Sequence, residues 1–357
     1  MPHDLTFLKD HSLKQNNTFG FDVVAENYFE TDSLDNLAEA LAHAKARRWP
    51  INVLGGGSNL VLTDTLPGLT IRQSNKAIRY TVPDSNGNVT VTASAGYNWH
   101  ELVIDTVSQN LAGLENLTMI PGDVGAAPVQ NIGAYGVELK DRFSALTALH
   151  IASGKLLRFS LEDCEFSYRD SFFKRNAGQY LITEVSLLVN QRNALNFSYK
   201  ALQDQLRKKN IEKPNVKDIS DAVSAVRTSK LPAPTELGNA GSFFHNPVIS
   251  ASHYKSLRKN FPGIVAYAQA DGRVKLAAGW LIDYLGFKGH QENGVGVYEK
   301  QALVLTHNGQ SNSHALLTLA EKIRSAVYSK FHVQLKIEPQ IWPHTSNTAY
   351  VASVIHT

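Results

Sequence analysis

The stretch GNAGSFFHNP (238–247) places one hydroxyl group, that of Ser242, between small residues and two phenylalanines. The glycines and the alanine before it allow the backbone to approach another group closely, and Phe243 and Phe244 can exclude water from that place. The alternative is the end of a strand or helix that carries a packed pair of phenylalanines. The stretch alone leaves open which task needs one serine hydroxyl in a tight, partly dry corner.

A second candidate site is the glycine-rich segment LGGGSN (54–59), which directly follows the apolar strand-like residues 51–53. Its glycines free the backbone to turn N–H groups inward and form a nest that binds anions, and its serine and asparagine add donors. Such a nest suits a pyrophosphate, whereas a turn between two strands would use the same glycines, so both interpretations stay open. The segment is neither a Walker A loop nor the spaced Gly-x-Gly-x-x-Gly of a Rossmann turn.

A longer segment, IPGDVGAAPVQNIGAYGVEL (120–139), contains too much glycine and proline for a stable helix and is too apolar for a solvated loop. Close backbone approach to a flat ligand is indicated by its glycines, Gly122, Gly125, Gly133 and Gly136. Gln130 and Asn131 offer amide contacts to the same ligand. A buried connection between domains is the alternative. Two glycine-rich segments in neighbouring parts of the chain suit an extended dinucleotide, which favours the ligand.

Two charged residues lie among apolar neighbours. Arg169, in FSYRDSFFKR (166–175), either forms a structural ion pair, with Asp170 as the available partner, or offers a guanidinium fork to a carboxylate or phosphate. Glu338, in LKIEPQIWPH (335–344), is either a solvated strand end or, beside a ligand, an acid or hydrogen-bond donor.

Composition and charge argue against several classes of protein. The histidines show no His-Glu-x-x-His spacing and Cys164 is the single cysteine, so we expect no metal site, no internal disulfide and a reducing cytoplasm. A net charge of +3, from 35 basic and 32 acidic residues without a dense basic block, does not indicate nucleic-acid binding but is compatible with one anionic small molecule. No apolar run approaches the ~18 residues of a membrane span, and the N-terminus lacks the apolar core of a secretory signal, so we expect no membrane insertion. Ser242 lies in Gly-Ser-Phe rather than in Gly-x-Ser-x-Gly, which weakens a serine-hydrolase interpretation.

The length of 357 residues suggests that two or three domains position these residues. The first seventy residues predict a small βαβ-like unit with a strand at 22–30, a helix that Ser33 caps at its N-terminus, and a strand from Ile51. Further predicted strands lie at 88–96, 144–152, 180–189 and 332–338, and predicted helices near 99–110, 217–228, 275–285 and 312–330. The polar stretch 207–218 is the candidate linker.

Eight segments, taken in order, resemble one family of flavoenzymes, the UDP-N-acetylenolpyruvoylglucosamine reductases, which complete UDP-N-acetylmuramate in bacterial peptidoglycan synthesis. The segments are NTFG (17–20), LGGGSN, IPGDVGAAPVQNIGAYGVEL, YRDS (168–171), RTSKLP (227–232), GNAGSFFHNP, AAGWLID (277–283) and IEPQI (337–341). Each is weak alone, but their order extends from about residue 15 to residue 342. A flavin oxidase of the same superfamily and a non-enzymatic nucleotide-binding module are the rival classes.

The resemblance implies an α+β fold, in which an FAD-binding fold of the vanillyl-alcohol oxidase type, made of two α+β subdomains, is joined to a C-terminal α+β substrate-binding domain. We expect the two FAD-binding subdomains at residues 1–71 and 72–216, and the substrate-binding domain at 217–357, with its C-terminal strand returning to the active site. The implied cofactors are non-covalent FAD and NADPH, the hydride donor. The residues implied for FAD are Leu54, Gly55, Gly56, Gly57, Ser58, Asn59, Gly122, Gln130, Asn131, Gly133, Ala134 and Arg227.

The resemblance also implies that a UDP-sugar and NADPH share one cleft of a monomer. Hydride from NADPH reaches the terminal alkene carbon of an enolpyruvyl ether by way of FAD and leaves an enolate, which Arg169 stabilises with the help of Glu338. Ser242 then donates the proton to the adjacent carbon. Substrate contacts are implied for Tyr199, on an extra loop at 196–206, and for Lys230, Asn246 and Gln301.

The sequence departs from the family pattern at two places. His245 stands where relatives often have lysine, so one positive charge near the substrate phosphates is missing or depends on pH. After Glu338, Gln340 and Trp342 replace the usual glutamate and arginine, which leaves the local ion pairing of Glu338 open.

Overall fold

The computed structural model describes residues 5–192 and 195–343 of the chain. The chain divides into two compact units that alternate along the sequence. Unit 1 consists of Met1–His11, Val24–Gly56 and Leu66–Thr228, and unit 2 of Ser12–Val23, Gly57–Thr65 and Ser229–Thr357. The glycine-rich segment 54–59 therefore begins in unit 1 and ends in unit 2. The predicted boundaries at residues 71 and 216 stay a prediction.

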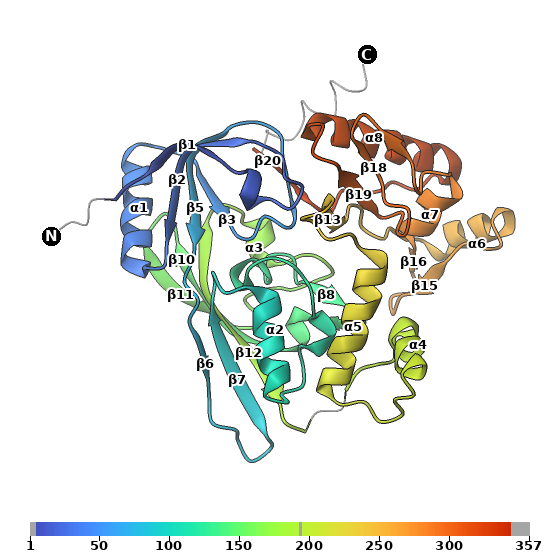
Figure 1. Cartoon of the computed structure of the whole chain (residues 1–357), viewed down its shortest axis with the longest axis horizontal. Helices are drawn as coiled ribbons and strands as arrows, with labels where there is room; N and C mark the ends of the chain where they lie inside the picture. The colour runs from blue at the N-terminus through green and yellow to red at the C-terminus, as the bar shows by residue number, and fades with distance from the viewer. Residues whose placement is uncertain (1–4, 193–194, 344–357) are drawn as a thin grey trace. The chain divides into compact units, whose positions relative to one another are not determined.

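The first layer of unit 1 is a four-stranded sheet with the strand order β1-β2-β5-β3 (Figure 1). Its strands are β1 (Leu8–Ser12), β2 (Val24–Thr31), β5 (Leu66–Gln73) and β3 (Ile51–Leu54). Both β2 and β3 pair in parallel with β5, so these three strands end at the same edge of the sheet. The glycine-rich segment leaves the sheet at that edge.

Helix α1 (Leu34–Ala46) connects β2 to β3 and lies against this sheet (Figure 1). The Ser33 hydroxyl oxygen caps the helix by accepting the Asn36 N–H at 3.3 Å, an interaction typically worth about 1 kcal/mol. The helix buries a stripe of small and aliphatic side chains against the sheet, namely Leu37, Ala40, Leu41 and Ala44. The predicted βαβ unit and its serine cap are confirmed.

The second layer of unit 1 is a five-stranded antiparallel sheet with the order β11-β10-β12-β7-β6. Its strands are β11 (Lys155–Phe159), β10 (Phe143–His150), β12 (Tyr180–Asn190), β7 (Asn88–Ser94) and β6 (Ile78–Tyr80). Helix α2 (Trp99–Ser108) shares one apolar core with this sheet through Trp99, Leu102 and Val103.

The long segment between α2 and β10 contains only short elements. These are the 3₁₀ turns η2 (Glu115–Leu117), η3 (Val124–Ala126) and η4 (Leu139–Asp141), and the hairpin of β8 (Gly133–Ala134) with β9 (Val137–Glu138). Helix α3 (Phe172–Arg175) follows the second sheet's β11, and α4 (Lys200–Lys208) packs with α5 (Val216–Lys230) in a small core of their own.

The described residues of unit 2 form three sheets. The largest has the order β13-β19-β18-β17, the second β14-β16-β15, and the third is the parallel pair of β20 with β4. Their bounds are β13 (Gly238–Ser242), β19 (Val304–His307), β18 (Val295–Val297), β17 (Gln291–Glu292), β14 (Val248–Ile249), β16 (Val274–Leu276), β15 (Ala266–Ala268), β20 (Gln340–Trp342) and β4 (Leu60–Leu62). The 3₁₀ turn η1 (Lys14–Asn16) and the helices α6 (Ala251–Asn260), α7 (Ala278–Tyr284) and α8 (Ser313–Phe331) complete the unit.

The core of unit 2 joins segments that are far apart in the sequence. Phe19, Phe21 and Val61, from its two N-terminal segments, pack in one cluster with Phe243, Phe244 and the buried face of α8. This shared core explains why the short segments 12–23 and 57–65 belong to a unit that is otherwise C-terminal.

The structure corrects two predicted elements. Residues 332–338 do not form the predicted strand. Of these residues only Ile337 makes a β-bridge, with Phe244, and the next strand, β20, begins at Gln340. The alternating apolar side chains there, Val333 and Leu335, are buried in the core without a ladder of backbone bonds. The predicted linker 207–218 is also too wide, because α4 extends to Lys208 and α5 begins at Val216.

Candidate functional site

The first half of the glycine-rich segment is packed against the 120–127 loop within unit 1. A Cβ atom on Gly56 would lie 2.7 Å from the Gly122 Cα, and one on Gly55 would lie 3.3 Å from the Ala126 Cβ. Only residues without a side chain allow this approach. The two segments that sequence patterns assign to one ligand are therefore in direct contact at the edge of the first sheet.

The second half of the segment is held by unit 2. Gly57 has the positive φ of 61° that favours glycine, and its carbonyl oxygen accepts the Thr18 N–H at 3.2 Å. The Asn59 carbonyl oxygen accepts the Gln340 N–H at 2.9 Å, and the Asn59 amide donates to the Glu338 carbonyl oxygen at 3.5 Å. These bonds connect the predicted cofactor segment with the predicted catalytic glutamate.

The loop around Asn131 and Gly133 is braced by side chains of unit 1. The buried Asn131 amide donates to the Glu138 carboxylate at 3.0 Å and to the Ser167 carbonyl oxygen at 3.1 Å, and its oxygen accepts the Lys140 N–H at 3.0 Å. The side chain thus positions the loop. A Cβ atom on Gly133 would lie 2.9 Å from the Val137 carbonyl oxygen, so this position also requires glycine.

Arg169 holds the same loop. Its guanidinium donates to the Asn131 carbonyl oxygen at 3.3 Å and to the Gly133 carbonyl oxygen at 2.5 Å, and its backbone has the left-handed φ of 54°. The expected alternative, an ion pair with Asp170, is wrong, because Asp170 pairs with Arg175. Two carbonyl oxygens therefore fix the plane of the Arg169 guanidinium beside one predicted cofactor segment.

Arg227, on α5, is a partly buried cation in unit 1. Its Nε is inaccessible to solvent and donates to no acceptor, and among the described residues no carboxylate forms an ion pair with its guanidinium. Burial lowers the pKa of Arg227, an effect that the nearby Tyr135 hydroxyl opposes. Burial and, secondly, the charge of Arg227 also lower the pKa of His100. A partly buried guanidinium that pairs with no carboxylate of the described residues suits an anionic or strongly polar ligand.

Ser242 and Glu338 are brought together within unit 2 by backbone bonds. Ser242 is exposed at the end of β13, and the Glu338 N–H donates to the carbonyl oxygen of the next residue, Phe243, at 2.9 Å. The Glu338 side chain is 14% exposed, and its Oε2 lies 3.5 Å from Nδ1 of His245. The structure thus places the departure from the family pattern, His245, directly beside Glu338.

The expectation of a dry corner around Ser242 needs correction. Phe243 and Phe244 are 0% and 1% exposed and pack in the unit 2 core with each other and with Phe19. Their packing holds the end of β13 in place, and they do not cover Ser242. Both sequence interpretations of this stretch therefore contain part of the answer, because a packed phenylalanine pair carries an exposed hydroxyl.

The predicted substrate residues have different surroundings. Tyr199 is 46% exposed at the start of α4, with its ring centroid 5.4 Å from that of Tyr135 in an edge-to-face pair. Lys230 is exposed at the end of α5. The Asn246 side-chain oxygen accepts the first N–H of α7 at 2.9 Å, and the Gln301 side-chain oxygen accepts the Leu303 N–H at 3.4 Å.

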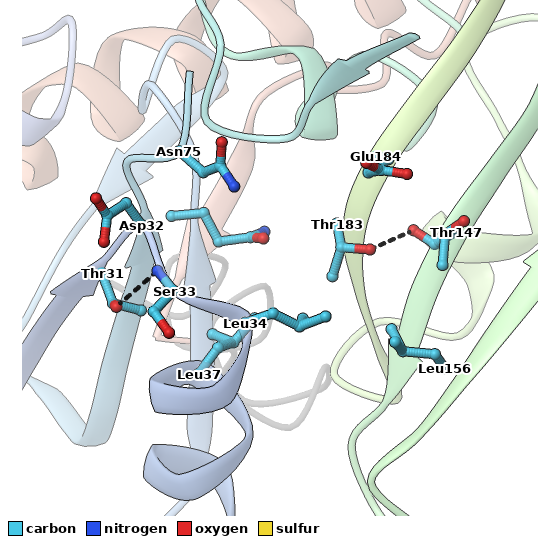
Figure 2. A pocket seen from close by; sticks show the side chains of 11 residues that line it. Thr31, Asp32, Ser33, Leu34, Leu37, Asn75, Thr147, Leu156, Thr183 and Glu184 are labelled. Atoms are coloured by element: carbon cyan, nitrogen blue, oxygen red, sulfur yellow. Dashed lines mark hydrogen bonds between the residues drawn. The ribbon is translucent and has the colours of Figure 1, made fainter. Parts of the chain in front are cut away.

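Unit 1 also contains a pocket of about 220 Å³ that sequence reasoning did not find (Figure 2). Thr31, Ser33 and Leu34, at the start of α1, face Thr147 and Thr183 of the second sheet across it (Figure 2). The Thr183 hydroxyl donates to the Thr147 carbonyl oxygen at 3.1 Å. No predicted cofactor or substrate residue is among those that line this pocket.

Sequence reasoning also missed Asp123, which lies between the two packed glycine segments. Its side chain is 9% exposed and its Oδ2 lies 3.8 Å from a guanidinium nitrogen of Arg72, at the end of β5. The signal was present in the sequence, because Asp123 is the only ionisable residue of the stretch IPGDVGAAPVQNIGA.

In the part of the chain that the structure describes, no helix is long and apolar enough to cross a membrane, and no cluster of three His, Cys, Asp or Glu residues could hold a metal ion.

Comparison with known proteins relates this arrangement to flavoenzymes. Residues 25–160 match the family described as FAD binding domain, and residues 233–342 match the one described as UDP-N-acetylenolpyruvoylglucosamine reductase, C-terminal domain. Among solved structures, the UDP-N-acetylenolpyruvylglucosamine reductase of Thermus caldophilus has a TM-score of 0.66 at 23% identity and covers 95% of this chain and 100% of its own. A solvent-stable cholesterol oxidase has a TM-score of 0.50 at 13% identity and covers 94% of this chain and 87% of its own. Both likenesses concern the fold alone.

Curated relatives are much more similar in sequence. The UDP-N-acetylenolpyruvoylglucosamine reductase of Pseudomonas fluorescens strain Pf0-1 is 47% identical over 328 residues, which are 92% of this chain and 96% of that protein. The corresponding reductase of Ralstonia nicotianae is 46% identical over 93% of this chain and 98% of its own length. The reductase of Pseudomonas aeruginosa strain PAO1 is 46% identical over 94% of this chain and 99% of its own length.

The match to the FAD-binding domain and the curated relatives define a class, the FAD-dependent oxidoreductases. Within that class, the chain belongs to the UDP-N-acetylenolpyruvoylglucosamine reductase family. The predicted α+β fold class, the family resemblance and the dependence on FAD are confirmed. The non-enzymatic nucleotide-binding module is therefore excluded.

Proposed function

We propose that this chain reduces the enolpyruvyl ether of UDP-N-acetylglucosamine to UDP-N-acetylmuramate, with bound FAD and with NADPH as hydride donor, in bacterial peptidoglycan synthesis. The observation that carries the proposal is the 47% identity to a reductase of this name over 92% of the chain. When bound, FAD supplies the hydride-transfer chemistry that amino-acid side chains lack. We place the enzyme in the bacterial cytoplasm, as a monomer whose one cleft takes NADPH and the UDP-sugar in turn.

The residues present fit the cofactor. The contact of Gly55 and Gly56 with the 120–127 loop leaves backbone rather than side chains at the edge of the first sheet, which suits a diphosphate. Arg227 supports the assignment, because a partly buried cation that pairs with no carboxylate of the described residues can bind a polar or anionic part of the cofactor. We therefore propose the segments 54–59 and 122–134, together with Arg227, as the FAD site, within FAD-binding subdomains at 1–71 and 72–216.

The proposed chemistry assigns separate tasks to three residues. Addition of hydride to the terminal alkene carbon places charge on the neighbouring carbon, as an enolate spread onto the substrate carboxylate. The planar guanidinium of Arg169, fixed by two carbonyl oxygens, stabilises that charge, and Glu338 assists. The Ser242 hydroxyl donates the proton to the carbon and is afterwards reprotonated from solvent, to which it is exposed.

Two kinds of contact support the assignment of substrate residues. Tyr199 and Lys230 are exposed, as ligand-binding side chains are before a ligand covers them. The side-chain oxygens of Asn246 and Gln301 each accept a backbone N–H, that of Asn246 from the first residue of α7, so their amide groups are held in one place. We propose all four as contacts to the UDP-sugar, in a substrate-binding domain at 217–357.

One absorbance experiment tests the proposed function. The purified yellow protein should lose its flavin absorbance near 450 nm on addition of NADPH under nitrogen, and the UDP-enolpyruvyl sugar should restore it, as expected for a flavin cofactor. Air serves as the comparison, since a flavin oxidase would regain its colour from oxygen at least as fast as from the sugar. Rapid recovery with oxygen and none with the sugar would favour the oxidase class and contradict the proposal.

A further inference from the structure

The carboxyl group of Asp123 is buried at the contact between the two glycine-rich segments of unit 1. Asp123 precedes the 3₁₀ turn η3 in the capping position, yet its side chain caps none of the N–H groups of that turn. An aspartate at such a position usually accepts one of them. Its Oδ2 is instead inaccessible to solvent and has no hydrogen-bond partner.

The Asp123 side chain lies against the first two glycines of the 54–59 segment. A Cβ atom on Gly56 would be 3.4 Å from Oδ1, and one on Gly55 would be 3.9 Å from Oδ2. A carboxylate that is nine-tenths buried and lacks a donor is costly, and such a group tends to take up a proton instead.

Charges of both signs lie around Asp123. Arg72 lies 3.8 Å from Oδ2, but it also lies 3.7 Å from the carboxylate of Glu30, so it is shared between two acids. Lys76 adds a weaker positive contribution and Glu101, on α2, a weaker negative one. Burial therefore dominates and raises the pKa of Asp123 to about 6, although Arg72 opposes the shift.

We propose that Asp123 sets how tightly the chain holds its flavin dinucleotide, because its carboxyl group must be neutral for the anionic dinucleotide to bind beside it. This inference rests on the proposed function, which assigns the 54–59 segment to the diphosphate of FAD. An added anion favours the protonated form of a neighbouring carboxyl group, so binding of the dinucleotide and uptake of a proton are linked.

The linkage has a definite sign. Below the pKa of the free protein, Asp123 is already neutral and the affinity does not change with pH. As the pH rises above about 6, binding must recover a proton, and the Kd for FAD rises by up to about tenfold per pH unit until the carboxyl group also ionises in the complex. If the ionised carboxylate instead accepted a ribose hydroxyl, the Kd would fall over the same range.

Quenching of flavin fluorescence measures this Kd on full-length protein from which FAD has been removed. Between pH 5.5 and pH 8.5, we expect the Kd for FAD to rise at least about tenfold in the wild type. Asp123→Asn keeps the size of the side chain and removes its charge, so it should bind FAD more tightly than the wild type at pH 8.5. Glu162→Gln removes an exposed carboxylate of unit 1 and serves as the matched control. Its Kd for FAD should depend on pH as that of the wild type does.

Each outcome decides the proposal. A wild-type Kd that stays constant, or that rises equally in Asp123→Asn, would overturn the role of Asp123 while leaving FAD binding intact. No binding of FAD at any pH would instead overturn the proposed function. If Asp123→Asn does not fold, calorimetry on the wild type in two buffers of different ionisation enthalpy decides the question. Proton uptake on FAD binding, larger at pH 7 than at pH 5.5, supports the proposal, and its absence contradicts it.

Discussion

The two units hold their proposed functional residues by different means. In unit 1, the charged groups are held through their side chains, since two carbonyl oxygens orient Arg169 and the Nε of Arg227 is enclosed away from solvent. In unit 2, backbone bonds from residues 243–245, directly after β13, to residues 336–338 bring Ser242 and Glu338 together over a buried phenylalanine pair. The side chain of Ser242 contributes little to its own placement.

This difference follows from side-chain length. An arginine has several rotatable bonds, so contacts along its guanidinium must offset about 2 kcal/mol of rotamer entropy. A serine hydroxyl is only one rotatable bond away from the backbone, and a rigid strand end places it. Conservative replacements should therefore be costly for the arginine of unit 1, whereas a replacement of the serine that keeps a proton donor on the same backbone should retain part of the function.

The largest effect is expected for Ser242→Ala. The variant should fold, bind FAD and oxidise NADPH normally, but reduce the substrate roughly 10²–10⁴-fold more slowly, as is typical of a lost general acid. Ser242→Cys should recover part of the rate, since the thiol sits on the same strand end and can deliver a proton. Stopped-flow absorbance separates the two half-reactions.

The control for this variant is Ser252→Ala, at an exposed serine of α6 outside the site. It should leave both half-reactions unchanged. Equal slowing of both half-reactions in Ser242→Ala, or normal reoxidation by the substrate, would mean that Ser242 only packs or binds.

Arg169→Lys is expected to have the next largest effect. Lysine keeps the charge but loses the planar fork that bonds to the Asn131 and Gly133 carbonyl oxygens, so substrate reduction should slow by about tenfold to a hundredfold. Oxidation of NADPH should be nearly unaffected, because that step activates no carboxylate. Single-turnover rates with substrate measure the loss.

Arg175→Lys is the matched control, because Arg175 pairs with Glu165 and Asp170 in partly exposed ion pairs of the same loop region. Such pairs contribute little, so its rates should stay at the wild-type level. If Arg169→Lys also turns over like the wild type, Arg169 is a structural residue.

Gly56→Val tests the contact between the two glycine-rich segments of unit 1, which we assign to the FAD site. A Cβ atom at this position meets the Gly122 Cα at 2.7 Å, so the two glycine segments must separate. Overpacking of this kind typically costs 1–3 kcal/mol, and we expect FAD affinity to weaken by about tenfold. Flavin absorbance per mole of protein, with the Tm as a check on folding, measures the effect. Gly263→Val, where a Cβ atom meets nothing within 4 Å, should retain the full flavin content. A fully yellow Gly56→Val protein would show that the segment is merely a turn.

Much of the fold could be predicted because local patterns determined it. The serine cap and apolar stripe of α1, and the alternating strands β7, β10 and β12, are signals that lie within one segment. The strand predicted at 332–338 failed because alternation reports burial, and burial there comes from core packing without a ladder. The interleaving of segments 12–23 and 57–65 with unit 2 depends on contacts between distant parts of the chain, which no local pattern contains.

The candidate site shows the same limit. Glycine patterns identified the segments that approach each other closely, and the order of motifs led to the family. The alternative that pairs Arg169 with Asp170 failed, because Asp170 pairs instead with Arg175, five residues further on. The exposed position of Ser242 was missed, since two adjacent phenylalanines suggested a dry pocket, although both side chains turn into the core. Side-chain direction after a strand end is decided by tertiary packing.

The smallest effect is expected at His245, where unit 2 does use a side chain to adjust its site. His245 lies 3.5 Å from the Glu338 carboxylate, and histidine usually changes charge between pH 5 and pH 8. A protonated imidazole places a positive charge beside Glu338, and a neutral imidazole does not. His245→Lys keeps the charge at all these pH values. The ratio of variant to wild-type rates of substrate reduction should therefore rise by about two- to fivefold between pH 6 and pH 8.5, a range that matches the modest energy of a partly exposed pair.

Steady-state kcat/KM for the UDP-sugar at each pH measures this ratio, and His314→Lys, at an exposed histidine of α8, supplies the control. A ratio independent of pH would show that His245 acts on Glu338 through its shape rather than its charge, and the contrast between the side-chain placement in unit 1 and the backbone placement in unit 2 would then be sharper.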